Sequence, residues 1–297
     1  MKAVAQLRQL LASGEFLVAP GAYDGISAMT IEQAGFPLAY MTGSGTAASL
    51  GYPDIGLVTM TEMVERAAAI ARSIRIPLIA DADTGYGNEL NVTRTVREYE
   101  SRGVAGLHLE DQVTPKKCGH LDGKDVVPRA DFISKIRAAV QARHSPDFVI
   151  IARTDARAVA GFDEAIARAN EALSAGADMV FVEAPESIDE MRSIPRLVQG
   201  PCMLNLVGGG KTPQVGFDEA QAMGFKLAIL PGALFRSAIA TFDQVLADIK
   251  TKRCLVSPPA NGVKGGFQRF GLDEWKEIEQ RARPSGGGTR GASIPLC

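Results

Sequence analysis

The sequence predicts a (β/α)8 barrel of the TIM-barrel class, and three observations support this. Short apolar runs alternate with helix-like segments along about 230 residues, which gives eight strand–helix units. The strand-like runs are continuously apolar, as is typical of parallel strands buried on both faces. A recurring glycine separates a helix from the next apolar run. An open, Rossmann-like sheet is the alternative, but no Gly-x-Gly-x-x-Gly motif follows the first strand.

The predicted elements alternate in order along the chain. Strands are expected at residues 15–19, 38–42, 76–80, 104–109, 147–152, 179–182, 202–205 and 226–230. Helices are expected at residues 24–33, 60–73, 90–101, 129–143, 163–174, 187–198 and 218–223. Glycines follow four of these helices, at Gly35, Gly103, Gly176 and Gly224. Glycine adopts the left-handed conformation that ends a helix without a steric penalty, so these positions support the boundaries.

The two ends of the chain depart from this pattern. Residues 1–11 predict a short amphipathic helix without the features of a signal peptide. We expect a barrel domain at residues 1–250 and a C-terminal helical extension at residues 251–283. Residues 284–297, rich in Gly, Ser and Pro, are expected to be a disordered tail. The extension carries apolar side chains, such as Trp275, that a completed barrel does not need, so we expect it to pack on a neighbouring subunit.

Composition excludes several classes of partner. Charged residues make up 22% of the chain and the formal net charge is −2, so no nucleic-acid-binding surface is predicted. No apolar run approaches the roughly 18 residues that span a bilayer, so no membrane association is expected. The four cysteines show no paired spacing, which favours a reduced, cytoplasmic protein.

Polar side chains gather where the predicted strands end. In this class of barrel the carboxyl ends of the strands form the active site. The polar and glycine residues at these ends are Tyr40, Thr42, Gly43, Ser44, Asp81, Asp83, His108, Glu110, Arg153, Glu183 and Asn205. Chance placement would scatter such residues along the strands, so we expect them to form one site.

Three of these side chains are candidates for a metal site. Asp81 and Asp83 are two residues apart, which in a strand places both side chains on the same side. Adjacent carboxylates repel each other unless a cation lies between them. Glu110 adds a third carboxylate, and Asp54 can reach the same ion through a water molecule. Oxygen ligands of this kind favour Mg²⁺ or Mn²⁺ over zinc. A hydrogen-bonded acidic rim without metal is the alternative.

The loop at residues 110–120 has the highest density of reactive groups. It carries two acids, two lysines, a thiol and an imidazole, which suits a loop that closes over a charged substrate and transfers a proton. Cys118 follows the lysines and precedes Gly119 and His120. Cationic neighbours lower the pKa of a thiol and favour proton transfer. A small buried side chain without a chemical role is the alternative.

Two further groups are candidates for binding an anion. Thr42, Gly43 and Ser44 form a turn of small residues whose N–H groups can approach an anionic oxygen closely. A plain tight turn is the alternative. Arg153 at a strand end requires an anionic partner, which we expect to be a substrate carboxylate or Glu183.

Four stretches resemble the isocitrate lyase/phosphoenolpyruvate mutase superfamily. They are residues 81–87, 106–112, 116–120 and 151–155, and the similarity extends over roughly residues 10–250. The third stretch, Lys-Lys-Cys-Gly-His, resembles the lyase branch, which cleaves carbon–carbon bonds in 2-hydroxy acids. Within that branch the sequence is most similar to 2-methylisocitrate lyases and 2,3-dimethylmalate lyases.

The resemblance implies a role for each candidate. Asp83 would bind Mg²⁺ directly, and three acids would act through waters, namely Asp54, Asp81 and Glu110. Cys118 would be the general acid that protonates the leaving enolate. The resemblance also implies a homotetramer with an exchanged C-terminal helix. The residues implied to bind or orient the carboxylic acid substrate are Tyr40, Thr42, Gly43, Ser44, Gly119, His120, Arg153, Glu183 and Asn205.

One position departs from the resemblance. Methylisocitrate lyases carry an acidic residue three positions after the asparagine that matches Asn205, and Gly208 stands there in this sequence. Dimethylmalate lyases share the Gly-Gly-Lys-Thr-Pro ending of this stretch but usually carry a glutamate before it. The sequence therefore leaves two alternatives for the distal end of the substrate, a carboxylate or an alkyl group.

The expected function is a Mg²⁺-dependent carbon–carbon lyase. It would cleave a 2-hydroxy di- or tricarboxylic acid to an α-keto acid, such as pyruvate, and a second carboxylic acid. The sequence does not identify the general base. An oxaloacetate hydrolase or decarboxylase on the same site is one alternative, and a barrel that only binds carboxylates is another.

Overall fold

The computed structural model describes residues 3–255 and 262–283, so the predicted tail at 284–297 lies outside the described residues. The chain divides after Ala240 into two compact units, and each is described by itself. None of the described helices is both long enough and apolar enough to cross a membrane.

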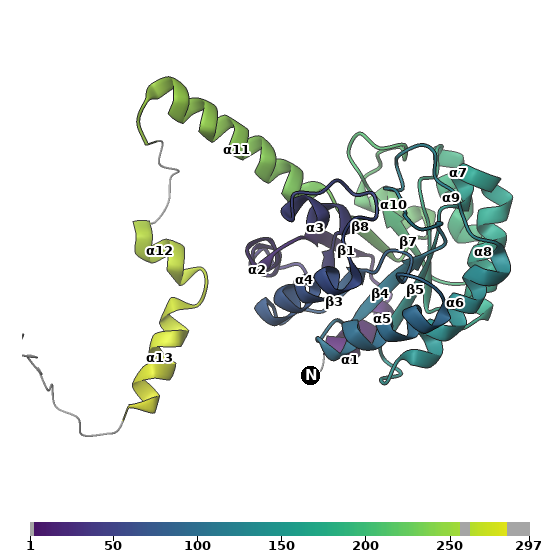
Figure 1. The fold of residues 1–297 in the computed structure, drawn as a ribbon, viewed down its shortest axis with the longest axis horizontal. Coiled ribbons are helices and arrows are strands. Elements are labelled where there is room, and N and C mark those ends of the chain that lie inside the picture. The colour runs from purple at the N-terminus through teal and green to yellow at the C-terminus, as the bar shows by residue number, and fades with distance from the viewer. Residues whose placement is uncertain (1–2, 256–261, 284–297) are drawn as a thin grey trace, which may run out of the picture. The chain divides into compact units, whose positions relative to one another are not determined.

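The first unit is a closed barrel of eight parallel strands (Figure 1), which confirms the predicted fold class. The strands are β1 (Leu17–Ala22), β2 (Ala39–Met41), β3 (Leu78–Asp81), β4 (Gly106–Glu110), β5 (Val149–Thr154), β6 (Met179–Val182), β7 (Cys202–Asn205) and β8 (Leu227–Leu230). Each strand pairs with the next, and β8 closes the ring by pairing Leu227 with Leu17 of β1. All eight carboxyl ends therefore meet at one end of the barrel.

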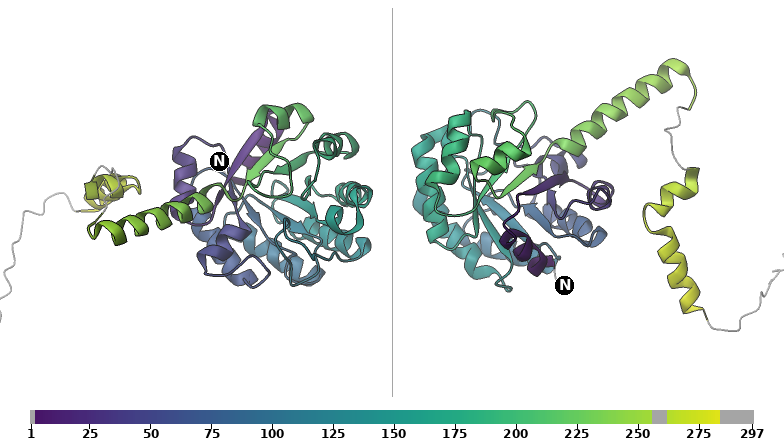
Figure 2. Two further views of the ribbon diagram at one scale, coloured as in Figure 1. Left: turned by 90° about the horizontal axis from the view of Figure 1, so that it is seen from above. Right: turned by 180° about the vertical axis from the view of Figure 1, so that it is seen from behind.

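Helices surround the strands in Figures 1 and 2. The helices of this unit are α1 (Ala3–Ala12), α2 (Gly25–Gln33), α3 (Gly43–Ser49), α4 (Met60–Ser73), α5 (Glu89–Ser101), α6 (Arg129–Ala142), α7 (Ala156–Ala160), α8 (Phe162–Ser174), α9 (Ile188–Leu197) and α10 (Phe217–Met223), and α11 (Ala233–Lys252) begins here. Local sequence sets several boundaries. Thr59, for example, caps α4 and forms a reciprocal capping box with Glu62.

The core has two layers because successive strand side chains point to opposite faces of the sheet. One layer lies between the sheet and the helices. The other fills the barrel interior and includes Leu7 of α1, Tyr40 of β2 and Phe181 of β6. A Cβ added to Gly106, the first residue of β4, would lie 3.3 Å from Leu7, so α1 covers the amino-terminal end of the barrel. Tyr40 and Phe181 lie toward the other end, where the site forms.

Four helices lie outside the predicted elements: α3, α7, α11 and α12 (Gly262–Gln268). Where the sequence predicts a tight turn after β2, α3 begins instead. Thr42 caps this helix, and its Oγ1 accepts a hydrogen bond from the N–H of Gly45. Such a cap satisfies one of the free N–H groups of a first helical turn, which is why threonine suits the position.

The second unit contains the end of α11, then α12 and α13 (Leu272–Ala282). The helix α13 lies within the helical extension predicted at residues 251–283. None of these three helices has a buried residue. Phe267 is 60% exposed and Trp275 is 69% exposed, so this unit has no apolar core of its own among the described residues.

Candidate active site

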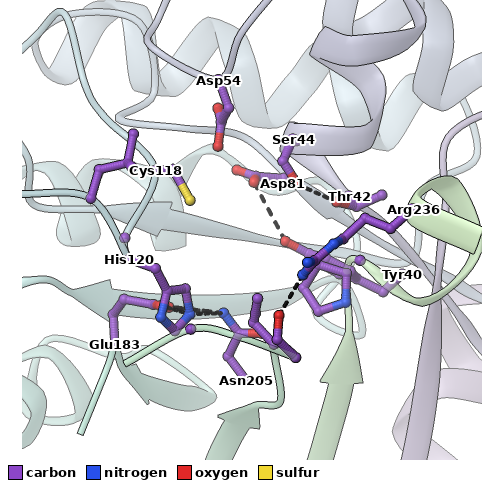
Figure 3. A pocket seen from close by; sticks show the side chains of 18 of the residues that line it. Tyr40, Thr42, Ser44, Asp54, Asp81, Cys118, His120, Glu183, Asn205 and Arg236 are labelled. Atoms are coloured by element: carbon purple, nitrogen blue, oxygen red, sulfur yellow. Dashed lines mark hydrogen bonds and ion pairs between the residues drawn. The ribbon is translucent and has the colours of Figure 1, made fainter. Parts of the chain in front are cut away.

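A cavity of about 310 Å³ opens at the carboxyl ends of the strands (Figure 3), a volume suited to a small ligand. Most of the predicted site residues line it, namely Tyr40, Thr42, Gly43, Ser44, Asp54, Asp81, Cys118, Gly119, His120, Arg153, Glu183 and Asn205. Asp83 and Glu110 are not among its lining residues, although both are buried and contact residues of the site. The structure therefore brings most of the predicted residues together around one cavity.

Asp54 and Asp83 both bind the ammonium group of Lys116. Lys116 Nζ lies 2.9 Å from Asp83 Oδ1 and also forms an ion pair with Asp54 Oδ1. Burial by itself lowers the pKa of Lys116, but the surrounding carboxylates, led by Asp83 and Asp54, outweigh burial and raise that pKa well above its ordinary value. A positive charge thus holds two carboxylates together at the base of the loop.

A turn, and not strand alternation, brings Asp83 to this point. β3 ends at Asp81, so the expectation that both aspartates share one face of a strand is wrong. Asp83 has a φ of 45°, in the left-handed region that residues with a side chain rarely adopt. Its N–H donates to Asp81 Oδ1 at 2.9 Å, which holds the turn in place. Burial is the main cause that raises the pKa of Asp83, to about 6.

The acidic groups meet some, but not all, of the requirements of a site for a divalent cation. Both carboxylate oxygens of Glu110 are buried without a hydrogen-bond donor, although Arg153 Nη1 lies 3.2 Å from Oε2. Burial raises the pKa of Glu110 well above its ordinary value. Buried carboxylate oxygens that lack donors are suited to a hydrated Mg²⁺ ion. Across residues 3–255 and 262–283, however, no three acidic, His or Cys side chains converge enough to hold a metal together. This arrangement is compatible with one direct ligand and others that act through waters.

The residues at the start of α3 form one wall of the cavity. Thr42 Oγ1 and Ser44 Oγ lie 3.1 Å apart and share a hydrogen bond. Gly43 packs directly on Asp81, because an added Cβ would lie 2.3 Å from Asp81 Oδ2. Only glycine therefore fits at residue 43 while Asp81 keeps its position.

Tyr40 and His108 form a buried stacked pair. Their ring centroids are 5.7 Å apart, and the Tyr40 hydroxyl lies 2.8 Å from His108 Nε2. The same hydroxyl lies 3.4 Å from Asp81 Oδ2. Burial lowers the pKa of His108 to about 3, so its imidazole is neutral near physiological pH. A neutral ring that hydrogen-bonds Tyr40 positions that hydroxyl in the cavity wall.

Three carboxylates hold Arg153. Its Nε and Nη2 donate to the two oxygens of Asp155 at 2.9 and 3.2 Å, and its Nη1 faces Glu110. Glu183 lies farther away, with Oε2 3.8 Å from Nε. Asp155, and not Glu183, is therefore the bidentate partner, which corrects the prediction. The sequence offered one signal for this pairing, since Asp155 follows Arg153 by two residues, directly after the end of β5.

The loop after β4 packs onto the far strands of the site. His120 Nε2 lies 3.0 Å from Glu183 Oε1, and His120 Nδ1 accepts the N–H of Lys211 at 3.0 Å. Asn205 Nδ2 donates to both oxygens of Glu183, at 3.2 and 3.3 Å. The predicted distal residues Glu183 and Asn205 are thus brought together, and His120 joins them to the loop after β7.

Two more contacts keep the loop close to Arg153. A Cβ added to Gly119 would lie 2.5 Å from both Arg153 Nη2 and Glu183 Cγ, so glycine is needed for this approach. Lys124 Nζ lies 2.8 Å from Asp155 Oδ1 and also donates to the carbonyl oxygen of Gly119. Lys124 was not among the predicted site residues, and it ties the loop to β5.

Cys118 lies in this loop with its sulfur pointing into the cavity (Figure 3). Burial raises the pKa of its thiol, and Asp54 raises it further. The neighbouring lysines do not lower this pKa as predicted, because Lys116 binds the aspartates and Lys117 Nζ donates to the carbonyl oxygen of Gly123. That prediction is wrong. A thiol that stays protonated is nevertheless suited to donating a proton.

Part of the cavity wall comes from segments absent from the predicted site. These residues follow β7 and β8 and are Val207, Gly208, Gly209, Gly210, Pro231, Gly232, Phe235 and Arg236. Arg236 lies in the first turns of α11, and its Nη1 donates to the carbonyl oxygen of Gly208. The available signal was the barrel pattern itself, because residues that follow the last strand also lie at the carboxyl end.

The fold and the site define a (β/α)8-barrel enzyme whose cavity combines an arginine, a protonated thiol and buried carboxylates. The model of the phosphoenolpyruvate phosphomutase family matches residues 7–250, most of the chain. The protein therefore belongs to the phosphoenolpyruvate phosphomutase/isocitrate lyase superfamily, which confirms the resemblance found in the sequence.

Relatives within this family include several lyases. The 2,3-dimethylmalate lyase of Eubacterium barkeri is 50% identical over 234 residues, which are 78% of this chain and 81% of that protein. The 2-methylisocitrate lyase of Aeropyrum pernix is 44% identical over 246 residues, 83% of this chain and 79% of that protein.

Solved structures of other family members are also similar. An oxaloacetate acetylhydrolase in complex with the inhibitor 3,3-difluorooxalacetate has a TM-score of 0.92 and 39% identity, and the match covers 95% of this chain and 97% of that chain. A phosphonopyruvate hydrolase in complex with oxalate and Mg²⁺ has a TM-score of 0.86 and 31% identity, covering 95% and 99%. A relative with this fold thus binds a small carboxylate together with a divalent metal.

Proposed function

We propose that this protein is a Mg²⁺- or Mn²⁺-dependent carbon–carbon lyase that cleaves a 2-hydroxy di- or tricarboxylic acid to an α-keto acid and a second carboxylic acid. The lyase relatives at 44 and 50% identity support this class. The observation that carries the proposal is the Cys118 thiol, which lies in the same cavity as Arg153 and Asp81. A barrel that only binds carboxylates needs no proton donor there.

The cavity offers donors for the keto-acid half of the substrate. Three of the five N–H groups of Arg153 face Asp155 and Glu110, which leaves two for a substrate carboxylate. The start of α3 supplies the N–H groups of Gly43 and Ser44. Hydrogen bonds from Arg153 and α3 would hold the carboxylate while the bond beside it breaks.

Asp83 would hold the metal directly, with three acids acting through waters, namely Asp54, Asp81 and Glu110. When bound, the ion would polarise the carboxylate and the 2-oxygen of the substrate. The ammonium group of Lys116 lies between Asp54 and Asp83, so this position already accepts a positive charge.

Cys118 would donate the proton that completes the reaction. A general base, which is not assigned to a residue, takes the hydroxyl proton of the substrate. The C2–O bond then becomes a carbonyl, and the electrons of the C2–C3 bond move to carbon 3. The resulting carboxylate enolate takes the thiol proton of Cys118. The raised pKa of that thiol keeps the proton available until the enolate forms. His120 and Glu183 position the loop that carries the thiol.

Hydrolysis or decarboxylation of oxaloacetate is a second candidate, favoured by the similarity to the oxaloacetate acetylhydrolase structure. Assays with a panel of 2-hydroxy acids and oxaloacetate distinguish a lyase from an enzyme that acts on oxaloacetate and from a protein that only binds carboxylates. Lactate dehydrogenase would detect keto acid, oxalate and acetate would be measured separately, and each assay would run with chelator and with added Mg²⁺ or Mn²⁺. Metal-dependent keto-acid release from a 2-hydroxy acid supports the lyase. Oxalate and acetate, or pyruvate from oxaloacetate alone, support the second candidate, and no turnover supports a binding protein.

We also propose a cytoplasmic homotetramer in which a C-terminal extension, residues 251–283, is exchanged between subunits. The apolar side chains Phe267 and Trp275, exposed within their own unit, support this assembly. A chain that ends at Lys252, where α11 ends, should form smaller species in light scattering because it lacks these contacts. An oligomer of unchanged size, or a monomeric full-length protein at micromolar concentration, would contradict the proposal.

A further inference from the structure

Arg168, on α8, is a buried arginine that the proposed reaction does not use. Its side chain is not among the described residues that line the cavity, and the residue is only 5% exposed. Its Nη1 lies 3.1 Å from Asp111 Oδ2 and donates to the carbonyl oxygen of Val127 at 2.9 Å. Its Nε donates to Glu164 Oε1 at 2.8 Å. Because removing a charge from water costs free energy, the groups around a buried arginine must compensate for it.

Asp111 connects Arg168 to the end of β5. Asp111 directly follows β4, and it is fully buried. Its Oδ2, which faces Arg168, also accepts a hydrogen bond from Thr154 Oγ1 at 2.6 Å. Its Oδ1 accepts the N–H of Asp155 at 2.8 Å. One side chain therefore joins an arginine of the outer helices to the residue that pairs with Arg153.

Asp155 in turn sets the orientation of Arg153. It accepts hydrogen bonds from Nε and Nη2 of Arg153, and its Oδ1 also accepts one from Lys124 Nζ. Two hydrogen bonds to one carboxylate fix the plane of a guanidinium group, and so the direction of its remaining N–H groups. A continuous series of contacts thus runs from Arg168 through Asp111 and Asp155 to Arg153 in the cavity wall.

The two aspartates in this series repel each other. Burial is the main cause that raises the pKa of Asp111, to about 6, and the nearby carboxylate of Asp155 is the second. Each carboxylate has a cation of its own, which is Arg168 beside Asp111 and Arg153 beside Asp155. Without Arg168 the repulsion would be less compensated. Asp155 would then shift, and Arg153 would turn with it.

We propose that Arg168 is a positioning residue that acts through Asp111 and Asp155 to aim Arg153 at the substrate carboxylate. This inference rests on the proposed function, in which Arg153 binds the keto-acid half. Arg168 delivers no proton, so its loss should weaken the binding of carboxylates and raise KM more than it lowers kcat. A role in folding alone would reduce the amount of active enzyme and leave KM and ligand affinity unchanged.

The main test measures the binding of oxalate in the presence of Mg²⁺, a pair of ligands that the phosphonopyruvate hydrolase relative holds together. Calorimetry should show about tenfold weaker binding to Arg168→Met than to the wild type, in the range expected when a residue acts through a shared network. The KM for a cleaved 2-hydroxy acid should rise by a similar factor. Arg168→Lys, which keeps a cation beside Asp111, should restore most of the affinity. An unchanged affinity in folded Arg168→Met would overturn the inference.

Arg129→Met is the matched control. Arg129, on α6, pairs with Glu164, the same glutamate that Arg168 contacts, but it forms no printed contact with Asp111. Its replacement should therefore leave the affinity for oxalate close to that of the wild type. Equal losses in Arg129→Met and Arg168→Met would show that the packing of α8, and not the contact with Asp111, is responsible. Thermal unfolding of each variant checks that the barrel is folded.

Two further variants test the route through Asp111. Adding Asp111→Asn to Arg168→Met removes one of the two repelling charges and keeps an oxygen for the N–H of Asp155, so most of the lost affinity should return. A double variant as weak as Arg168→Met would rule out this route. Thr154→Val removes a donor to Asp111 and leaves every charge in place, so it applies even if Arg168→Met does not fold. It should weaken oxalate binding by a smaller factor, and an unchanged affinity would count against the inference.

Binding without turnover separates this inference from the lyase proposal. If Arg168→Met weakens oxalate binding but no 2-hydroxy acid is cleaved by the wild type, the lyase proposal fails and the role of Arg168 stands. If the wild type cleaves a 2-hydroxy acid but Arg168→Met changes neither oxalate affinity nor KM, the role of Arg168 fails alone. A wild type that binds no oxalate would overturn the role given to Arg153, and this inference with it.

Discussion

Arg153 and Arg236 line the same cavity, but their surroundings differ. Arg153 is 6% exposed, lies between three carboxylates and stacks 5.1 Å above the Phe181 ring. Arg236 is exposed and its guanidinium bonds only a backbone carbonyl among the described residues. A buried arginine that is paired with carboxylates positions its neighbours as well as a ligand, and removing one partner leaves an uncompensated buried charge. An exposed arginine without a carboxylate partner can be replaced at little cost to the fold.

This difference predicts that changes at the buried end affect both catalysis and stability, whereas changes at the exposed end have little effect on stability. The largest effect is expected at the acids beside Lys116. Asp83→Ala should abolish both metal binding and turnover, because it removes the direct ligand and leaves Lys116 with one carboxylate fewer. Calorimetry with Mg²⁺ or Mn²⁺ and the keto-acid assay would measure both.

A chelator should abolish activity in the same way, and added Mg²⁺ or Mn²⁺ should restore it. Asp189→Ala is the matched control, because this side chain is 95% exposed on α9. Full activity after exhaustive chelation, or in the Asp83 variant, would refute the metal assignment.

The second effect in size concerns the loop thiol. Cys118→Ser keeps a similar side-chain volume, but a hydroxyl is a much weaker acid than a thiol. General acid catalysis typically contributes about 10²–10⁴-fold, so we expect kcat to fall at least about 100-fold while metal and keto acid still bind. The variant should also lose active-site alkylation by iodoacetamide, which substrate should slow in the wild type.

Cys254→Ser, which changes an exposed thiol, is the control for both measurements. A Cys118→Ser enzyme that cleaves its substrate at nearly the wild-type rate would show that Cys118 is not the acid. A hydrolase or decarboxylase that acts on oxaloacetate, or a protein that only binds carboxylates, would then be better supported than the lyase.

A smaller effect, measured on stability, is expected at Asp155. Burial acts against its ionised form, but Arg153 and Lys124 outweigh burial and lower its pKa to about 2. A depressed native pKa contributes stability at pH values above the unfolded pKa of about 4, and this contribution is lost as pH falls toward 2. Asp155→Asn should therefore lower the free energy of unfolding at neutral pH by on the order of 2 kcal/mol.

Denaturant titrations of both proteins at neutral pH and near pH 3 would test this dependence. The difference between wild type and Asp155→Asn should shrink at the lower pH. A difference that is the same at both pH values would mean that packing, and not ionisation, accounts for the loss.

The local sequence pattern predicted the barrel, and most of the residues at the predicted strand ends line the cavity. Apolar runs and helix-ending glycines such as Gly103 are short-range signals, so β4 lies close to its predicted place. The pairing of Arg153 with Asp155 depends on side-chain geometry at the end of β5, which periodicity does not contain. The position of Lys116 between two aspartates depends on the path of a loop. Arg236 was missed because no helix was predicted after β8, although α11 carries apolar residues at helical spacing.

The close fit of Gly119 against Arg153 and Glu183 makes residue 119 sensitive to loop closure. A methyl group at this position would collide with both side chains unless the loop moved away from them. We therefore expect Gly119→Ala to weaken the packing of the loop, whichever acid occupies the cavity. A bound acid would then escape to solvent sooner, and its dissociation rate would measure the change.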